Sequence, residues 1–260
     1  MKKIKTLLIV GAVHGDEKVG VEVIKRLGKV IDKKKVFGLI ANHKALAKQV
    51  RFIDSDLNRS FPGANNGNYE QKLANNLLKK IRRYAYVVDF HSFSCKSEPF
   101  AILTKKSEEH FLLAESLGIK KIILMSSELA SGRSLIDYCT CGVSVEAGKH
   151  NLEATYKRAT NYGLKALERL RSFKAYSVKK NRVEYFEVVG ILFKKMNEEI
   201  EESITNFKLV YKGEIIARDG KRLIKSPYSF YPVLAREKSY SNILCLATKP
   251  VKIRERRKYD

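Results

Sequence analysis

The sequence predicts an α/β fold in which helices cover a mainly parallel sheet, followed by a smaller β-rich part. Up to about residue 172, short apolar runs alternate with segments whose apolar residues recur at helical spacing. Beyond that point the helical spacing ends, and short strand-like segments are punctuated by Gly213, Gly220, Pro227 and Pro232. We therefore expect one domain over residues 1–172 and a β-rich domain over residues 173–260.

The individual elements follow from these periodicities. Short, mostly apolar runs are typical of buried strands, and in the first part they are residues 7–10, 36–40, 85–90, 120–124 and 142–147. Amphipathic periodicity, such as Leu73, Leu77 and Ile81 on one face, predicts helices. The predicted helices are residues 18–30, 69–83, 107–117 and 151–173. The predicted strands of the second part are residues 183–193, 207–211, 214–217 and 243–247.

The chain is strongly basic, with 260 residues, a formal net charge of +23 and a pI near 9.8. Such a charge is compatible with nucleic-acid binding or with steering of anionic small molecules. The lysines are dispersed through all segments, and no zinc-finger, RNA-recognition or helix-turn-helix signature accompanies them. We interpret the charge mainly as that of solvated faces, so nucleic acid is not the expected partner.

Cellular location and redox state follow from what the sequence lacks. No apolar run approaches the ~20 residues needed to span a bilayer, and the apolar stretch over residues 6–10 is too short for a signal peptide. Cys95, Cys139, Cys141 and Cys245 form no C-x-x-C pair. We expect a cytoplasmic protein with reduced thiols and no membrane partner. The sequence leaves its oligomeric state open, a homo-oligomer included.

Two motifs at predicted strand ends supply candidate metal ligands. His14 and Glu17 follow the first strand, and His91 stands at the end of the strand that contains Asp89. Strand ends in an open α/β sheet line the usual ligand crevice, and two imidazoles with one carboxylate leave Zn²⁺ an open position for water. Asp89 shares a strand face with His91, where it could orient a ligand. The alternative is structural: a turn histidine beside an exposed glutamate, and a paired aspartate.

The polar stretch over residues 51–68 is too long and too specific for a simple connector. Arg51 beside a metal could stabilise a developing oxyanion. A second arginine of this stretch could hold a substrate carboxylate by two parallel hydrogen bonds, with Asn58 as a further donor. A surface loop with ordinary ion pairs is the alternative.

Glu146 ends an apolar predicted strand, in Ser144-Val145-Glu146-Ala147-Gly148. Burying this carboxylate is unfavourable unless a cation lies near. Beside a metal, Glu146 could take a proton from water and return it to a leaving nitrogen. A structural ion pair is the alternative.

These segments together resemble the aspartoacylase and succinylglutamate desuccinylase family, which is related to the zinc carboxypeptidases. The similar stretches are residues 14–17, 51–63, 89–91 and 145–148, in this order along the chain. The resemblance implies a zinc carboxypeptidase-like α/β/α sandwich. It also implies a smaller β-rich C-terminal domain that partly covers the cleft.

The same resemblance implies roles for particular residues. His14, Glu17 and His91 would bind one zinc ion per chain, with Glu146 as general base and acid. Arg51 would polarise the scissile carbonyl and stabilise the oxyanion.

Further residues would bind the substrate. Asn58 and Arg59 would hold the α-carboxylate of the amino-acid part, and Tyr240 would reach the site from the C-terminal domain. Arg133 is similar to the arginine that binds the carboxylate of the substrate side chain.

The predicted function is zinc-dependent removal of an acyl group, acetyl or succinyl, from a small anionic N-acyl amino acid such as N-acyl-aspartate or N-acyl-glutamate. One alternative is a carboxypeptidase-like peptidase. A second is a basic nucleic-acid-binding protein whose site is degenerate.

Overall fold

The computed structural model describes residues 6–28, 35–126, 132–171, 183–195, 197–240 and 242–253. Its helices are α1 (Val19–Leu27), α2 (His43–Lys48), α3 (Tyr69–Ile81), α4 (Glu108–Ser116) and α5 (Glu153–Arg171), with 3₁₀ helices η1 (Leu57–Arg59) and η2 (Leu135–Tyr138). Its strands are β1 (Leu7–Gly11), β2 (Val36–Ile40), β3 (Tyr86–Phe93), β4 (Phe100–Leu103), β5 (Lys121–Leu124), β6 (Gly142–Lys149), β7 (Glu184–Phe193), β8 (Glu199–Ile200), β9 (Ile215–Asp219), β10 (Arg222–Lys225), β11 (Tyr231–Val233) and β12 (Ile243–Val251).

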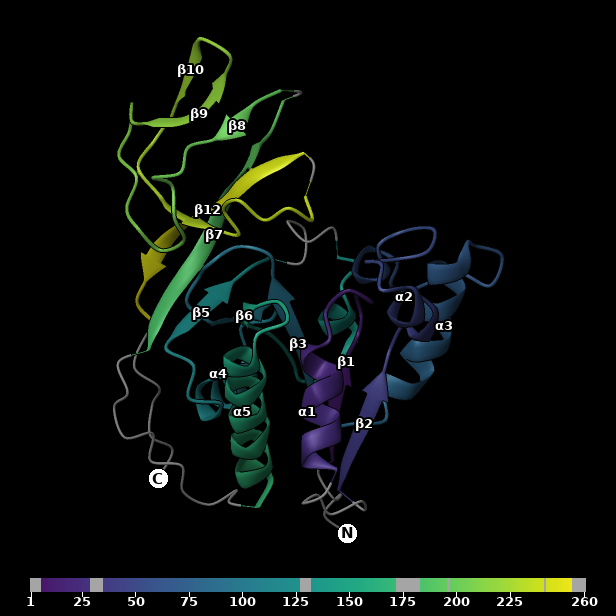
Figure 1. Cartoon of the computed structure of the whole chain (residues 1–260). Helices are drawn as coiled ribbons and strands as arrows, with labels where there is room; N and C mark the ends of the chain where they lie inside the picture. The colour runs from purple at the N-terminus through teal and green to yellow at the C-terminus, as the bar shows by residue number, and fades with distance from the viewer. Residues whose placement is uncertain are drawn as a thin grey trace.

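A nine-stranded sheet forms the centre of the molecule, in the order β11–β12–β7–β5–β4–β6–β3–β1–β2 (Figure 1). β2 pairs with β1, β1 with β3 and β3 with β6, all in parallel. β4 with β5 and β5 with β7 are also parallel pairs. β4 meets β6 antiparallel, and β12 and β11 extend the sheet antiparallel. The prediction of a mainly parallel sheet is therefore confirmed.

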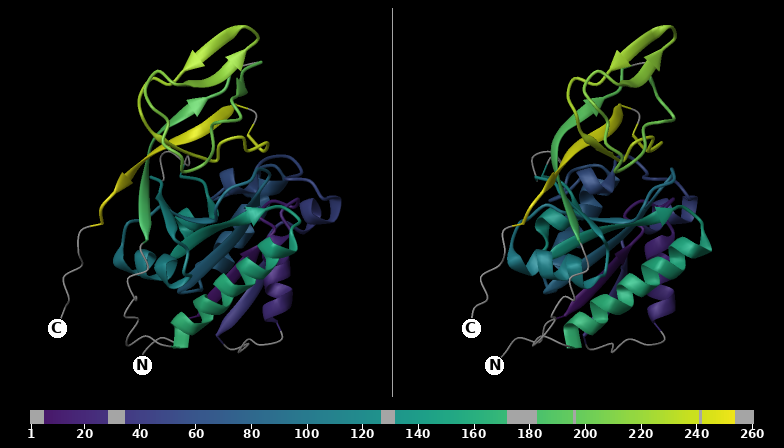
Figure 2. Two further views of the ribbon diagram at one scale, coloured as in Figure 1. Left: turned by 60° about the vertical axis from the view of Figure 1, so that its left-hand side comes forward. Right: turned by 90° about the vertical axis from the view of Figure 1, so that its left-hand side faces the viewer.

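Helices cover both faces of this sheet. In β1, Leu7 and Ile9 pack into one core with residues of α1, α4 and α5, whereas Leu8 and Val10 pack into another core with residues of α3. Successive strand side chains point to opposite faces, so an uninterrupted apolar run is what a strand buried on both sides requires. The result is a layered α/β/α arrangement (Figures 1 and 2).

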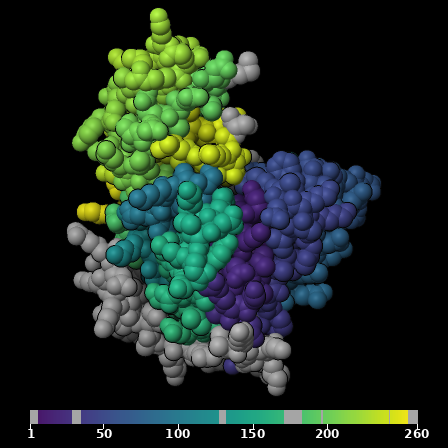
Figure 3. Space-filling model, viewed as in Figure 1, coloured from purple at the N-terminus to yellow at the C-terminus, as the bar shows by residue number. Residues whose placement is uncertain are grey.

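The C-terminal part adds β structure to one end of the molecule. β8, β9 and β10 form a separate three-stranded sheet, and in the space-filling view the residues coloured green to yellow form a lobe on the larger body (Figure 3). β7 pairs with β5, so strands from both sides of the predicted boundary at residue 172 share the central sheet. The division into residues 1–172 and 173–260 stays a prediction.

Two details differ from the sequence analysis. The strand predicted over residues 207–211 forms only an isolated bridge between Val210 and Phe230, and Phe207 at its start lies in a turn with a left-handed φ of 64°, which a strand does not accommodate. The short elements α2, β4, β8, β10 and β11 and the 3₁₀ helices η1 and η2 were not predicted. The predicted helix ends at residues 29–30 and 172–173 lie outside the described residues.

Candidate active site

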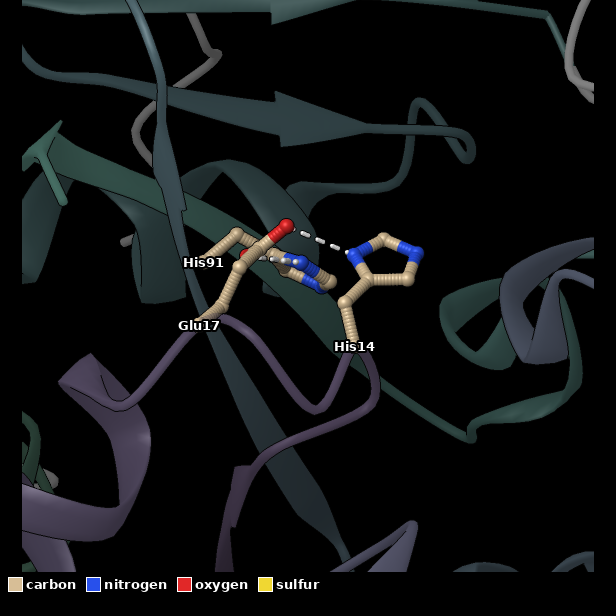
Figure 4. A group of neighbouring side chains, drawn as sticks. All are labelled: His14, Glu17 and His91. Atoms are coloured by element: carbon tan, nitrogen blue, oxygen red, sulfur yellow. Dashed lines mark hydrogen bonds and ion pairs between the residues drawn. The ribbon is translucent and has the colours of Figure 1, made fainter. Parts of the chain in front are cut away.

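Three side chains from two distant segments of the chain meet at the carboxyl ends of β1 and β3. His14 and Glu17 lie in the loop between β1 and α1, and His91 lies near the end of β3 (Figure 4). All three side chains are buried, and each offers one potential ligand atom within 4.8 Å of the others. Parallel pairing of β1 with β3 brings these positions to one edge of the sheet.

The loop between β1 and α1 is held in place by close backbone packing. A Cβ atom at Gly15 would lie 2.1 Å from the carbonyl carbon of Ala45, so a larger residue would not fit there. The N–H of Gly15 donates to the carbonyl oxygen of Arg51 at 3.1 Å. This contact joins the loop that carries His14 and Glu17 to the start of the long polar stretch.

The two imidazoles face the carboxylate of Glu17 through the same ring atom. Nδ1 of His14 lies 2.7 Å from Oε1 of Glu17, and Nδ1 of His91 lies 3.1 Å from Oε2. Nε2 of His14 lies 3.1 Å from Oδ1 of Asp56, and Nε2 of His91 lies 2.8 Å from Oδ2 of Asp89. Each imidazole is therefore held between two carboxylates.

This arrangement fits a metal ion. A carboxylate that accepts from one imidazole N–H leaves the other ring nitrogen as a lone-pair donor, as is common for metal-ligating histidines. The lone pairs of His14 and His91 would then face the acceptor oxygens of Glu17, which requires a cation or a proton between them. Two imidazole nitrogens and one carboxylate form a donor set that suits Zn²⁺ and leaves a coordination position open.

The electrostatics of the cluster follow from burial and close charges. Burial opposes ionisation of Glu17, but the imidazoles of His14 and His91 hold the pKa of this carboxyl well below its usual value. Burial likewise opposes protonation of His91, yet Asp89 and Glu17 raise its pKa well above the usual value. The cluster thus favours a positive charge at its centre.

Arg51 lies beside the three side chains. It donates to Oδ2 of Asp56 at 3.0 Å and to Oε1 of Glu17 at 3.3 Å. Its guanidinium carbon lies 5.6 Å from the ring centroid of Tyr240, which the C-terminal part contributes. Burial opposes the charge of Arg51, but Asp56 keeps the pKa of the guanidinium above its usual value.

Glu146 stands opposite His91 in the register of β6 with β3. Burial raises the pKa of Glu146 to about 8, although the charges of His91 and His14 act in the other direction. Its Oε2 atom is shielded from solvent and has no hydrogen-bond partner among the described residues. Glu146 is therefore a carboxyl group that can accept and return a proton near neutral pH.

This raised pKa predicts how the chelator-treated protein responds to pH. Folded Glu146 keeps its proton to about pH 8, whereas an unfolded glutamate loses it near 4.5. Between these values the folded state binds more protons, so the free energy of unfolding falls as pH rises, by the order of a few kcal/mol. We expect Glu146→Gln, which cannot ionise, to melt at a higher temperature than wild type at pH 9 and at a similar temperature at pH 5. An equal difference at both pH values would contradict the assigned pKa.

Residues 3–173 match the family model of the succinylglutamate desuccinylase/aspartoacylase catalytic domain. The chain belongs to this family. A succinylglutamate desuccinylase of Shewanella pealeana is 25% identical over 90% of this chain and 78% of that protein. A probable aspartoacylase of Prochlorococcus marinus is 30% identical over 56% of this chain and 54% of that protein. The matches to the Prochlorococcus aspartoacylases thus span only about half of their length.

Solved structures show the same fold across nearly the whole chain. Murine aminoacylase 3 superposes with a TM-score of 0.80 at 17% identity, covering 96% of this chain and 97% of that one. Succinylglutamate desuccinylase from Vibrio cholerae gives a TM-score of 0.76 at 19% identity, covering 97% of this chain and 83% of that one. The predicted fold class, a zinc carboxypeptidase-like α/β/α sandwich with a β-rich C-terminal part, is confirmed.

The candidate site opens into a cavity lined by His14, His91 and Glu146 and by two residues of the polar stretch, Asn58 and Arg59. Oδ1 of Asn58 accepts from the backbone N–H of Leu135 at 2.8 Å, which leaves its amide NH₂ group free to donate. One N–H of Arg59 donates to the carbonyl oxygen of Asn58 at 2.8 Å. The structure therefore brings Asn58 and Arg59 together with the metal-ligand candidates.

Arg133 is placed differently from the other predicted site residues. Its side chain is exposed, and it does not line the cavity, whereas its neighbour Ser134 does. Its carbonyl oxygen accepts from the N–H of Phe61 at 3.3 Å. Arg133 thus contacts the polar stretch through its backbone carbonyl group, and its side chain is not part of the cavity lining.

Two acidic residues beside the metal-ligand candidates, Asp56 and Glu237, were not predicted. Asp56 binds both His14 and Arg51, and it lies within the polar stretch that was singled out without a role for this residue. Glu237 is buried beside the cluster and accepts hydrogen bonds from Ser94 and Ser239. Asp56 lies six residues ahead of Pro62 in the polar stretch, and this position gives no signal of its own, because its contacts with His14 and Arg51 depend on the tertiary structure.

Proposed function

We propose that the chain is a zinc-dependent amidohydrolase that releases the acyl group of an N-acyl amino acid, with one zinc ion bound by His14, Glu17 and His91. The observation that carries this proposal is the orientation of both imidazoles, whose Nδ1 atoms face Glu17 while carboxylates engage their Nε2 atoms. Membership of the family supports the reaction class. A bound zinc ion would supply a Lewis acid that lowers the pKa of water toward ~7 and polarises a carbonyl group.

The protein's own residues would carry the proton transfers. Glu146 takes a proton from the attacking water, whose oxygen bonds to the amide carbon, and then delivers it to the leaving nitrogen as the C–N bond breaks. Arg51, whose guanidinium lies beside the cluster, donates hydrogen bonds to the oxyanion that forms on the former carbonyl oxygen. The products are a free carboxylate and a free amino acid.

Residues of the polar stretch would bind the amino-acid half of the substrate. Arg59 pairs with the α-carboxylate and Asn58 donates its amide N–H to it, which makes an anionic substrate the preferred one. Tyr240, close to Arg51, would close the site from the C-terminal side.

A hydrolysis screen of the zinc-loaded protein tests the proposed reaction. N-acetyl, N-formyl and N-succinyl amino acids are offered beside a panel of short peptides, and the release of free amino acid is measured before and after chelation. We expect turnover of N-acyl amino acids that zinc restores after chelation. Turnover of peptides alone would favour a carboxypeptidase-like enzyme, and tight, steeply salt-dependent binding of DNA or RNA without bound zinc would favour the nucleic-acid alternative.

Replacing Asp56 by asparagine is expected to weaken zinc binding by about 10- to 100-fold, because the carboxylate that orients Nε2 of His14 is lost. Competition with a chromogenic chelator measures the affinity. Asp54→Asn is the matched control, since Asp54 lies in the same stretch but is exposed and accepts from the N–H of Tyr69. Equal affinities of the two variants would show that Asp56 does not orient the ligand.

A further inference from the structure

The site divides into two recesses of different chemistry that meet at the candidate catalytic groups. Both recesses are lined by His14, Glu146, Leu234 and Tyr240. The larger, with about 750 Å³ of empty volume, also contains Asn58 and Arg59; the smaller, with about 250 Å³, also contains Glu17 and Arg51. On the proposed function, the α-carboxylate lies at Arg59, so the amino-acid half of the substrate occupies the larger recess and the acyl half the smaller one.

The wall of the larger recess is mostly apolar. Residues on or next to β4, β5, β7 and β12, on the far side of Glu146, supply most of it, and Ile136 of η2 adds to it. The apolar lining residues are Ile102, Met125, Ile136, Ile191, Leu234, Ile243 and Leu246, and the uncharged polar residues Thr104, Ser134 and Ser144 line the recess as well. Arg59 is the only lysine or arginine among the described residues that line this recess.

One arginine cannot serve two carboxylates of the same substrate. If Arg59 binds the α-carboxylate, a side-chain carboxylate would be buried against Ile102, Ile191 and Leu246 without a cation. Burying an unpaired carboxylate is strongly unfavourable, whereas an aliphatic side chain would gain contact with the same surface. Arg133, the residue expected to bind such a side chain, lies outside the recess.

The smaller recess disfavours a negatively charged acyl group, because the carboxylate of Glu237 already lines it. Glu237, with an exposed fraction of 7%, lines it and accepts hydrogen bonds from the N–H of Ser94 at 2.8 Å and from Oγ of Ser239 at 2.8 Å. Arg51, the cation on this side, already contacts Glu17 and Asp56. A succinyl group would therefore place a further carboxylate beside Glu237, in the smaller of the two volumes.

We infer that the substrate is an amino acid with an apolar side chain that carries a short, uncharged acyl group such as acetyl or formyl, rather than an N-acyl-aspartate or an N-succinyl amino acid. This inference rests on the proposed function, and it assigns side-chain specificity to the wall formed by Ile102, Ile191 and Leu246.

Steady-state kinetics of the zinc-loaded protein test this assignment with N-acetyl-leucine, N-acetyl-methionine, N-acetyl-aspartate and N-succinyl-leucine. We expect kcat/KM to be at least about 100-fold higher for N-acetyl-leucine than for N-acetyl-aspartate, and at least about 100-fold higher than for N-succinyl-leucine. Equal or faster hydrolysis of N-acetyl-aspartate or of N-succinyl-leucine would overturn the inference and leave the amidohydrolase proposal intact. If zinc-loaded protein hydrolysed no N-acyl amino acid, the proposed function itself would fail, and the inference with it.

A cation placed in the apolar wall gives a second, independent readout. Ile191→Arg is expected to shift the ratio of kcat/KM values toward N-acetyl-aspartate by at least about 10-fold. Val189→Arg is the matched control, because Val189 lies on the same strand, is 46% exposed and does not line the recess. Thermal melts confirm that both variants are folded. An unchanged ratio in folded Ile191→Arg protein would count against this wall as the specificity surface.

Discussion

Replacing Glu146 by glutamine is expected to lower kcat for an N-acyl amino acid by about 1,000-fold while zinc stays bound. Glutamine has nearly the same shape as glutamate but cannot accept the proton of the attacking water or deliver it to the leaving nitrogen. Glu146 is not one of the three side chains that converge as metal-ligand candidates, so its neutral replacement leaves the donor set unchanged. Turnover at saturating substrate and metal content of the same preparation give the two measurements.

The control for this substitution is Glu199→Gln, which neutralises an exposed glutamate on β8, outside both recesses. It is expected to keep wild-type turnover. Normal turnover in zinc-loaded Glu146→Gln protein would remove Glu146 from the mechanism. Loss of zinc in that variant would instead make Glu146 a contributor to metal binding.

Much of the framework of the site could be predicted from local sequence. β1, β3 and β6 are buried on both faces, so each appears as an apolar run, and a polar residue at the end of such a run is conspicuous. His14, His91 and Glu146 were found in this way. Parallel neighbours end at the same edge of a sheet, so the alternation of strands and helices was sufficient to expect these residues close together.

The rest of the site depends on strand order, which local patterns do not encode. β4 is only four residues long and lies antiparallel beside β6, and its Ile102 forms part of the cavity wall. Ile191 and Leu246 meet it only because β7 and β12 join the same sheet. In sequence these are ordinary apolar strand residues, with no sign that they face a ligand rather than the core.

The role expected for Arg133 does not fit its placement, and Asp56 was given no role, for a related reason. Arg133 and Asp56 both lie in polar loops, where sequence shows the charge but not its direction. In the structure, the carboxylate of Asp56 turns inward to His14 and Arg51, whereas the side chain of Arg133 is exposed. The role predicted for Arg133 was to bind a carboxylate on the substrate side chain, as in N-acyl-aspartate or N-acyl-glutamate, so the placement of this one side chain changes the expected substrate.

Replacing His91 by alanine is expected to weaken zinc binding by well over about 100-fold, more than the loss of an orienting carboxylate, because a ligand atom itself is removed. The substitution also leaves Asp89 buried without its imidazole partner, and Oδ1 of Asp89 already has no hydrogen-bond partner among the described residues. A lower melting temperature should therefore accompany the loss of metal.

The matched control is His110→Ala, because His110 on α4 is also buried but contacts Ser107 at the N-cap of that helix, and it is not one of the metal-ligand candidates. Both variants lose a buried imidazole, so a difference in zinc affinity between them isolates ligation from general destabilisation. Chelator competition at a temperature where both variants are folded measures that difference. Because His14 and Glu17 remain in His91→Ala, zinc binding as tight as that of His110→Ala would mean that these two residues hold the ion without His91, and the three-residue metal site would have to be abandoned.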